Sequence, residues 1–153
     1  MPANNPSLDT TRPETDLALT TLAQRSASGQ GSAVTLRGRF RWIEFELAVT
    51  NRTWTGGDAL DVYIQARNDG ANWRDVVHFY QDSFTGSPYT FLQKAWVPVH
   101  PDLTTGGTVA MFEQERMAGG TAAEALLGRE IRATWVISGT GQFTFQVLAF
   151  LRG

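Results

Sequence analysis

The feature that most constrains the fold is an alternating segment over residues 59–67. From Leu60 to Ala66 the even-numbered positions are apolar and the odd-numbered positions are polar or amphipathic, which is typical of a strand with one buried face. Asn68, Asp69 and Gly70 follow, and they tolerate the positive φ of a tight turn. Residues 73–80 are again β-branched and aromatic. The pattern predicts a hairpin whose apolar face must be covered by a second sheet.

Residues 39–50 predict another strand. Glu44 and Glu46 point away from its apolar face, whereas Phe40 and Trp42 are out of phase with it, which predicts a β-bulge near Trp42. The apolar face consists of Ile43, Phe45, Leu47 and Val49.

The end of the chain predicts a second hairpin, with strands over residues 129–137 and 143–151 and a glycine-containing turn over residues 138–142. From Val147 to Leu151 both faces are apolar, so we expect this strand to be buried on both sides or to lie at a subunit interface. Residues 89–97 predict a further strand, and Pro98 and Pro101 place it at a sheet edge because proline cannot donate to a ladder.

Two segments depart from the strand pattern. Residues 121–124 form a capping box that predicts one short helix over residues 122–127, ended by Gly128. Residues 1–30 are rich in Pro, Asn, Ser and Thr and are interpreted as an N-terminal arm, with a short strand through Leu17 and Leu19. The arm is either a tail or a segment that orders against a neighbouring subunit.

These segments predict an all-β chain, a jelly-roll-like antiparallel β-sandwich over residues 31–153, with one short helix and an extended N-terminal arm over residues 1–30. A length of 153 residues with 42% hydrophobic and 18% charged residues suits one globular domain. No apolar run is long enough for a spanning helix, so no membrane partner is expected. The first residues lack the basic and apolar regions of a signal peptide, which predicts folding in the cytoplasm of the producing cell.

The composition argues against several kinds of chemistry. Cysteine is absent, which excludes disulfides, thiolate catalysis and the usual zinc sites. A net charge of −2 disfavours nucleic-acid binding. His78 and His100 have no neighbouring ligand residue, and Glu44 and Glu46 share one strand face instead of flanking a cleft. The Asn- and Asp-rich residues 68–75 are explained by a turn without calcium. We therefore predict no catalytic residue, no metal and no cofactor.

The aromatic residues leave two alternatives open. The chain has five tryptophans, and alternation directs Tyr63 away from the predicted core. An exposed aromatic face is what a glycan-binding platform needs, and it is equally what a subunit interface needs.

With both hairpins placed, the chain resembles small β-sandwich proteins encoded in the structural gene clusters of tailed phages and prophages. The resemblance covers roughly residues 33–151 and depends on two blocks, residues 60–79 and residues 131–147. The first block contains Leu-Asp-Val-Tyr-Ile-Gln and Trp-Arg-Asp-Val-Val-His-Phe, and the second contains Ile-Arg-Ala-Thr-Trp-Val-Ile-Ser-Gly and Phe-Thr-Phe-Gln-Val. These motifs are structural.

The resemblance implies a virion component, with a capsid decoration (cement) protein as the first expectation. Such a protein binds the shell of the major capsid protein as a homotrimer, stabilises the head and resides on the capsid surface. The alternatives are another virion component, such as a head-fibre base, tail-tip or baseplate subunit, or a glycan-binding module. The residues expected to contact a partner are Leu17, Leu19, Leu22, Tyr63, Phe150 and Leu151.

Overall fold

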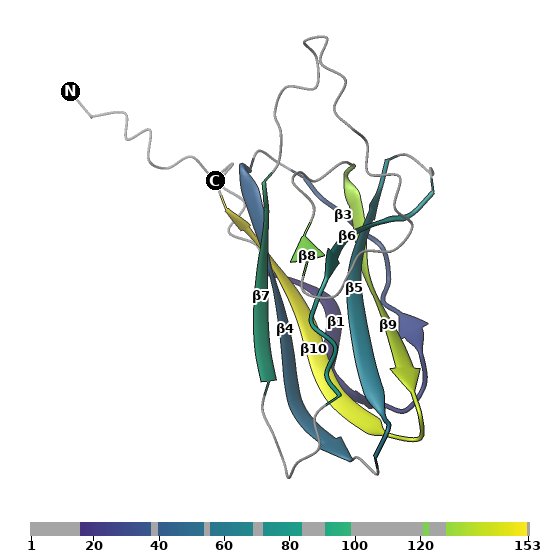
Figure 1. Cartoon of the computed structure of the whole chain (residues 1–153). Coiled ribbons are helices and arrows are strands. Elements are labelled where there is room, and N and C mark those ends of the chain that lie inside the picture. Colours follow the sequence, from purple (N-terminus) through teal and green to yellow (C-terminus); the bar gives the residue numbers. More distant parts are fainter. Residues whose placement is uncertain are drawn as a thin grey trace, which may run out of the picture.

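The computed structural model of the chain describes residues 16–37, 40–53, 56–68, 72–83, 91–98, 121–122 and 128–152. Every regular element in these residues is a β-strand, and the strands form two antiparallel sheets that face each other (Figure 1). The predicted all-β antiparallel sandwich is therefore confirmed. The finer jelly-roll assignment stays a prediction. Within the described ranges, no helix has the length and apolar character needed to cross a membrane.

The first sheet, sheet A, has four strands in the order β1-β10-β4-β7. Strand β7 is an edge strand, as its closing proline predicted. The strands are β1 (Asp16–Arg25), β10 (Gln142–Arg152), β4 (Trp42–Thr53) and β7 (Phe91–Pro98).

The second sheet, sheet B, has the order β2-β9-β5-β6-β8, and the short β3 also pairs with β9. The predicted hairpin is confirmed, since β5 and β6 pair antiparallel. The strands are β2 (Gly29–Gln30), β9 (Glu130–Ser138), β5 (Ala59–Arg67), β6 (Arg74–His78), β8 (Thr121–Ala122) and β3 (Val34–Thr35).

The core lies between the sheets and is built from alternate residues of the long strands. Because successive side chains of a strand point to opposite faces, each long strand contributes every second residue to it. The predicted inner faces of β4 and β5 are confirmed: their apolar side chains are at most 1% exposed. The largest buried side chains include Phe45, Phe143 and Phe145.

The predicted second hairpin is wrong. β9 and β10 follow each other through a tight turn but lie in opposite sheets, β9 beside β5 and β10 between β1 and β4 (Figure 1). The turn is fixed from outside: the carboxylate of Asp58 accepts a hydrogen bond from the Thr140 backbone N–H at 2.8 Å. Gly139 has a φ of +83°, and a side chain there would collide with Asp58. The two apolar faces therefore meet across the core instead of sharing one sheet.

Two further predictions need correction. The bulge expected near Trp42 is absent, because β4 begins there and pairs regularly with β10 up to Val49; the register shifts between Val49 and Asn51. The predicted helix over residues 122–127 is not seen either. Thr121–Ala122 forms β8 on β6, and residues 123–127 lie outside the described part.

The described part of the predicted arm belongs to the sandwich. β1 pairs along β10, with two register shifts between Ala18 and Ala23. Arg25 bridges this irregular stretch and β10, because its guanidinium donates to the carbonyls of Thr21, Ala23 and Phe145 at 2.8–2.9 Å. Residues 16–30 thus contribute strands to both sheets, and residues 1–15 lie outside the described part.

A buried ion pair joins the two sheets. Arg52, near the end of β4 in sheet A, pairs with Asp82, and the two side chains are 1% and 2% exposed. Asp82 exchanges both backbone hydrogen bonds with Leu60 of β5 in sheet B, at 2.9 and 3.0 Å. The pair therefore connects the two sheets through a contact with little access to water.

Candidate functional site

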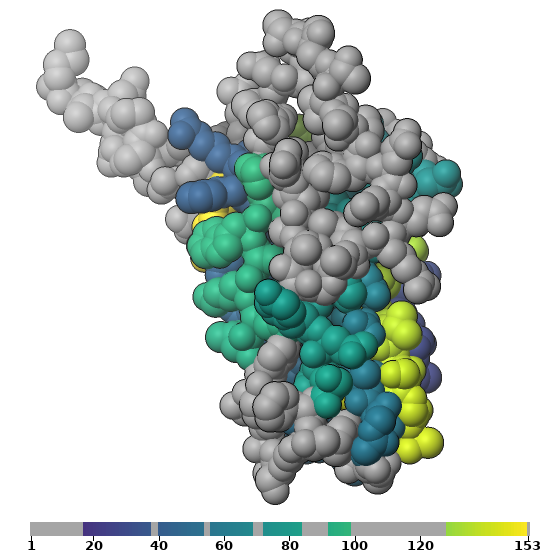
Figure 2. Space-filling view, viewed as in Figure 1, coloured from purple at the N-terminus to yellow at the C-terminus, as the bar shows by residue number. Residues whose placement is uncertain are grey.

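The outer face of sheet A carries large apolar side chains. We call Trp42, Leu92, Trp96 and Phe150 the tryptophan face. Trp42, Leu92 and Trp96 are 47%, 59% and 50% exposed, and the two indole rings are 5.6 Å apart between centroids. Phe150 is half-buried, with the guanidinium of Arg152 at 5.3 Å from its ring. The side chains of β7 stand on the molecular surface, in green at the left of Figure 2.

Four charged side chains lie in the middle of this apolar surface. The Glu44 side chain is only 6% exposed, and its carboxylate is 3.0 Å from the amine of Lys94 and 3.9 Å from the guanidinium of Arg152. Glu46 lies 3.5 Å from the same amine. The hydrogen bond to Glu44 and the charge of Glu44 raise the pKa of Lys94, and Glu46 adds to this effect. Two positive and two negative groups leave the cluster neutral.

This arrangement has two features of protein contact surfaces. Exposed aromatic residues around a neutralised ionic cluster are typical of subunit interfaces, whose centres are enriched in aromatic residues and poor in unpaired charge. Glu44 and Glu46 share one strand face, as predicted, but each is engaged by Lys94.

The outer face of sheet B is different, because its side chains are held by one another. His78 is 8% exposed, and its Nε2 is 3.1 Å from the Asp61 carboxylate, which also accepts a hydrogen bond from Gln81 at 2.7 Å. Tyr63 stacks on the His78 ring with a 4.0 Å centroid distance. These contacts give His78 a structural role on this face.

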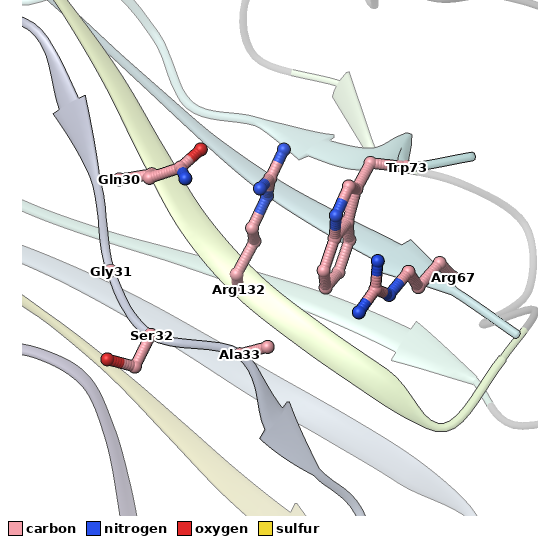
Figure 3. Close-up of a pocket in the computed structure, with 7 residues that line it drawn as sticks. All are labelled: Gln30, Gly31, Ser32, Ala33, Arg67, Trp73 and Arg132. Atoms are coloured by element: carbon pink, nitrogen blue, oxygen red, sulfur yellow. The ribbon is translucent and has the colours of Figure 1, made fainter. Parts of the chain in front are cut away.

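A pocket lies at one end of this second face. Trp73 stands between two guanidinium groups, with Arg67 at 4.4 Å and Arg132 at 4.3 Å from its ring centroid (Figure 3). The segment from Gln30 to Ala33 forms the opposite wall, and the pocket has a volume of about 420 Å³. The pocket thus combines two cations with an aromatic ring.

A hydrogen-bond chain orients Arg132 in this pocket. Gln65 donates to Asp75 at 2.8 Å, and its side-chain oxygen accepts from Nε and Nη2 of Arg132 at 3.0 and 2.9 Å. Arg67 donates to Glu130 at 2.6 Å. Burial lowers the pKa of Arg132, and the neighbouring charge of Arg67 lowers it further.

The leucines expected to bind a partner lie in different environments. Leu19 and Leu151 are 2% and 5% exposed and belong to the core, and Leu17 packs against it. Leu22 is 52% exposed.

The two aromatic residues of that prediction lie on opposite outer faces. Phe150 belongs to the tryptophan face, whereas Tyr63 points outward as predicted but is half-buried against His78. The sequence reasoning did not single out Trp42 and Trp96 as a pair. Alternation along β4 and β7 directs each ring outward, but their contact depends on the register in which β4 pairs with β7.

The structure describes some of the residues that were considered for metal binding or catalysis. Within the described residues, no group of three or more His, Asp or Glu side chains could hold a metal ion. Asp75, in the segment considered for calcium, is buried and bonded to Gln65. His100 and Asp69 lie outside the described part.

Comparisons with known proteins give no match: no protein-family model, no curated protein and no solved structure is significantly similar to this chain.

Proposed function

We propose that this chain is a structural protein of a tailed-phage virion, a capsid decoration protein that binds the shell of the major capsid protein as a homotrimer. Its work is attachment, and the proposal includes no chemical reaction. The virion role rests on the resemblance of the two strand blocks. The observation that supports attachment is the tryptophan face on the outer side of sheet A.

The tryptophan face is expected to contact the shell. Antiparallel sheets commonly turn polar side chains to water, so three apolar side chains about half exposed on neighbouring strands favour a protein partner. Trp42 and Trp96 are the expected energetic centre, because tryptophan is enriched among the residues that dominate binding. The ionic cluster around Glu44 is already neutral, so covering it leaves no charge without a partner.

A trimer would strengthen this contact through multivalency. Three joined subunits on one shell turn the second and third contacts into intramolecular events, which raises the overall affinity without any new contact. The edge strands of sheet A, β1 and β7, offer backbone groups that a neighbouring subunit could pair with or cover.

Binding to expanded heads of the virus that encodes the chain tests the proposal. The wild-type protein should sediment as a trimer and bind heads in stoichiometric amounts. Trp42→Ser/Trp96→Ser should weaken binding by about 10- to 100-fold, because both anchors are lost. Val136→Ser is the matched control, since Val136 is 42% exposed but lies on the outer face of sheet B.

Three results would contradict the proposal: no binding to heads, unchanged binding of the double variant, or equal loss in Val136→Ser. Circular dichroism should show that all variants keep the β-sandwich. Binding to tails or baseplates instead of heads would favour the alternative, another virion component. A glycan-binding module is the second candidate, and the pocket beside Trp73 is the observation that favours it.

A further inference from the structure

We propose that the pocket beside Trp73 binds an acidic sugar residue, a uronate or sialic acid unit of a glycan, through its carboxylate. The inference does not depend on the capsid role, because it concerns the face opposite the tryptophan face. Four observations support it: the orientation of Arg132, the two cations of the lining, the cation–π contacts of Trp73 and the volume of the pocket.

Arg132 is held in position, and the described residues engage only part of its donors. A guanidinium has five N–H donors, and Gln65 accepts from Nε and Nη2 only. Among the residues that the structure describes, no carboxylate forms an ion pair with Arg132. A ligand carboxylate can therefore meet a pre-oriented planar fork, the geometry that makes Arg–carboxylate pairs strong and specific.

The lining of the pocket has a net positive charge. Arg67 and Arg132 are the two charged residues of the lining. Outside the lining, Glu130 pairs with Arg67, and Asp75 accepts a hydrogen bond from Gln65, which holds Arg132. The lowered pKa of Arg132 reports the same situation, a partly buried cation close to a second one. A ligand carboxylate in the pocket would meet two cations of the lining and no acidic side chain of the lining.

Trp73 acts in the pocket as a spacer between cations. Figure 3 shows its indole between the guanidinium groups of Arg67 and Arg132, at 4.4 and 4.3 Å from their centres. These cation–π contacts orient both side chains. They also occupy the ring faces on which a neutral sugar would stack, so recognition must come from charge and hydrogen bonds.

The opposite wall fixes the width of the pocket. Gly31 donates its backbone N–H to the Ala133 carbonyl at 2.9 Å, and a Cβ at this position would collide with the Leu19 carbonyl. Glycine thus lets the wall lie close to β1 and β9. Gln30 turns its side-chain amide toward Arg132 and supplies groups suited to sugar hydroxyls (Figure 3).

The size of the space favours a sugar acid over an acidic side chain. A volume of about 420 Å³ lies in the range of small-molecule sites. The hollow is open to solvent, so a sugar ring can enter it with its carboxylate toward Arg132. A ring bearing a carboxylate and several hydroxyls can use both the guanidinium and the polar wall.

Calorimetry with the full chain tests the proposal, using methyl β-D-glucuronide and N-acetylneuraminic acid as probes and methyl β-D-glucoside as the neutral analogue. At least one acid should bind at least tenfold more tightly than the glucoside.

Arg132→Gln should weaken that binding at least tenfold. Ala33→Trp should do the same by filling the pocket from the other wall, with both arginines retained. Arg41→Gln, which removes an exposed charge outside the pocket, should have no effect.

Several outcomes would overturn the proposal. These are no binding of either acid, equal binding of acid and glucoside, or unchanged binding in both Arg132→Gln and Ala33→Trp. Competition by acetate at the same concentration would show a general anion site only. Tighter binding of a glutamate-rich peptide than of either sugar acid would assign the pocket to a protein partner. Thermal melting of each variant, with the wild type as reference, separates lost binding from lost folding.

Discussion

The outer faces of the two sheets differ in how their side chains are engaged. On sheet B, side chains such as Asp61 and Gln65 are tied to their neighbours by hydrogen bonds, and Arg132 beside Trp73 is held in the same way by Gln65. On sheet A, the tryptophan face adjoins one charge-balanced cluster around Glu44, and Trp42, Leu92 and Trp96 are about half exposed. The difference teaches that exposed apolar area and satisfied polar groups are distributed unequally between the two faces.

The largest expected effect comes from breaking the buried ion pair that joins the two sheets. Arg52→Met should lower the free energy of unfolding by about 3–5 kcal/mol, because it leaves the buried Asp82 carboxylate without its cation. Urea denaturation measures this. Arg52→Met/Asp82→Leu should recover much of the loss, since it removes both charges; a double variant as unstable as the single one would show that the ion pair is not the cause.

A smaller loss is expected at the turn that sends β9 and β10 into opposite sheets. Asp58→Ala removes the acceptor of the Thr140 backbone N–H and should cost about 1–3 kcal/mol in urea denaturation. Thr140→Ala keeps that N–H and should have little effect. If the two variants were equally stable, the carboxylate would not be what holds the turn.

The charged cluster inside the tryptophan face predicts a pKa shift. Lys94 is the only lysine of the chain, so its amine can be followed without ambiguity by NMR. Its pKa should lie above the ordinary value of about 10.4, and Glu44→Gln should lower it more than Glu46→Gln.

The sign of the linked stability effect follows from that direction. The unfolded chain has the lower pKa, so the stabilisation is complete below about pH 10.4 and is lost as the pH rises through the pKa of the folded protein. An equal or greater pKa decrease in Glu46→Gln would contradict the assignment of Glu44 as the main partner.

The smallest effect should come from the exposed part of the tryptophan face. Leu92 is 59% exposed, so Leu92→Ser should change the stability of the free protein by no more than about 0.5 kcal/mol. The same variant should bind heads more weakly than the wild type. A large loss of stability without a change in binding would mean that this face serves the fold instead of a partner.

The alternating segments made much of the fold predictable. The inner faces of β4 and β5 and the edge position of β7 follow from local pattern alone. The placement of β9 and β10 does not, because two alternating strands joined by a glycine turn have the same sequence pattern whether they pair in one sheet or face each other across a core. Their placement follows from long-range pairing of β9 with β5 and of β10 with β4 and β1, and Asp58, from a distant segment, adds a contact to the turn.

The candidate sites were less accessible to sequence reasoning. The pocket joins Trp73 to Arg67 and Arg132 from separate segments, and their meeting depends on the register of β5 against β9. Tyr63 shows the converse: alternation gives its direction correctly, but only the register against β6 shows that it is stacked on His78.

Hydroxyl-radical footprinting of the protein, free in solution and bound to expanded heads, tests attachment through sheet A most directly. Mass spectrometry reports the oxidation of each tryptophan separately. Trp42 and Trp96 should be oxidised readily in the free protein and protected on the head, while Trp73 on the opposite face reacts alike in both. Equal oxidation of Trp42 and Trp96 in the free and bound protein would contradict the account.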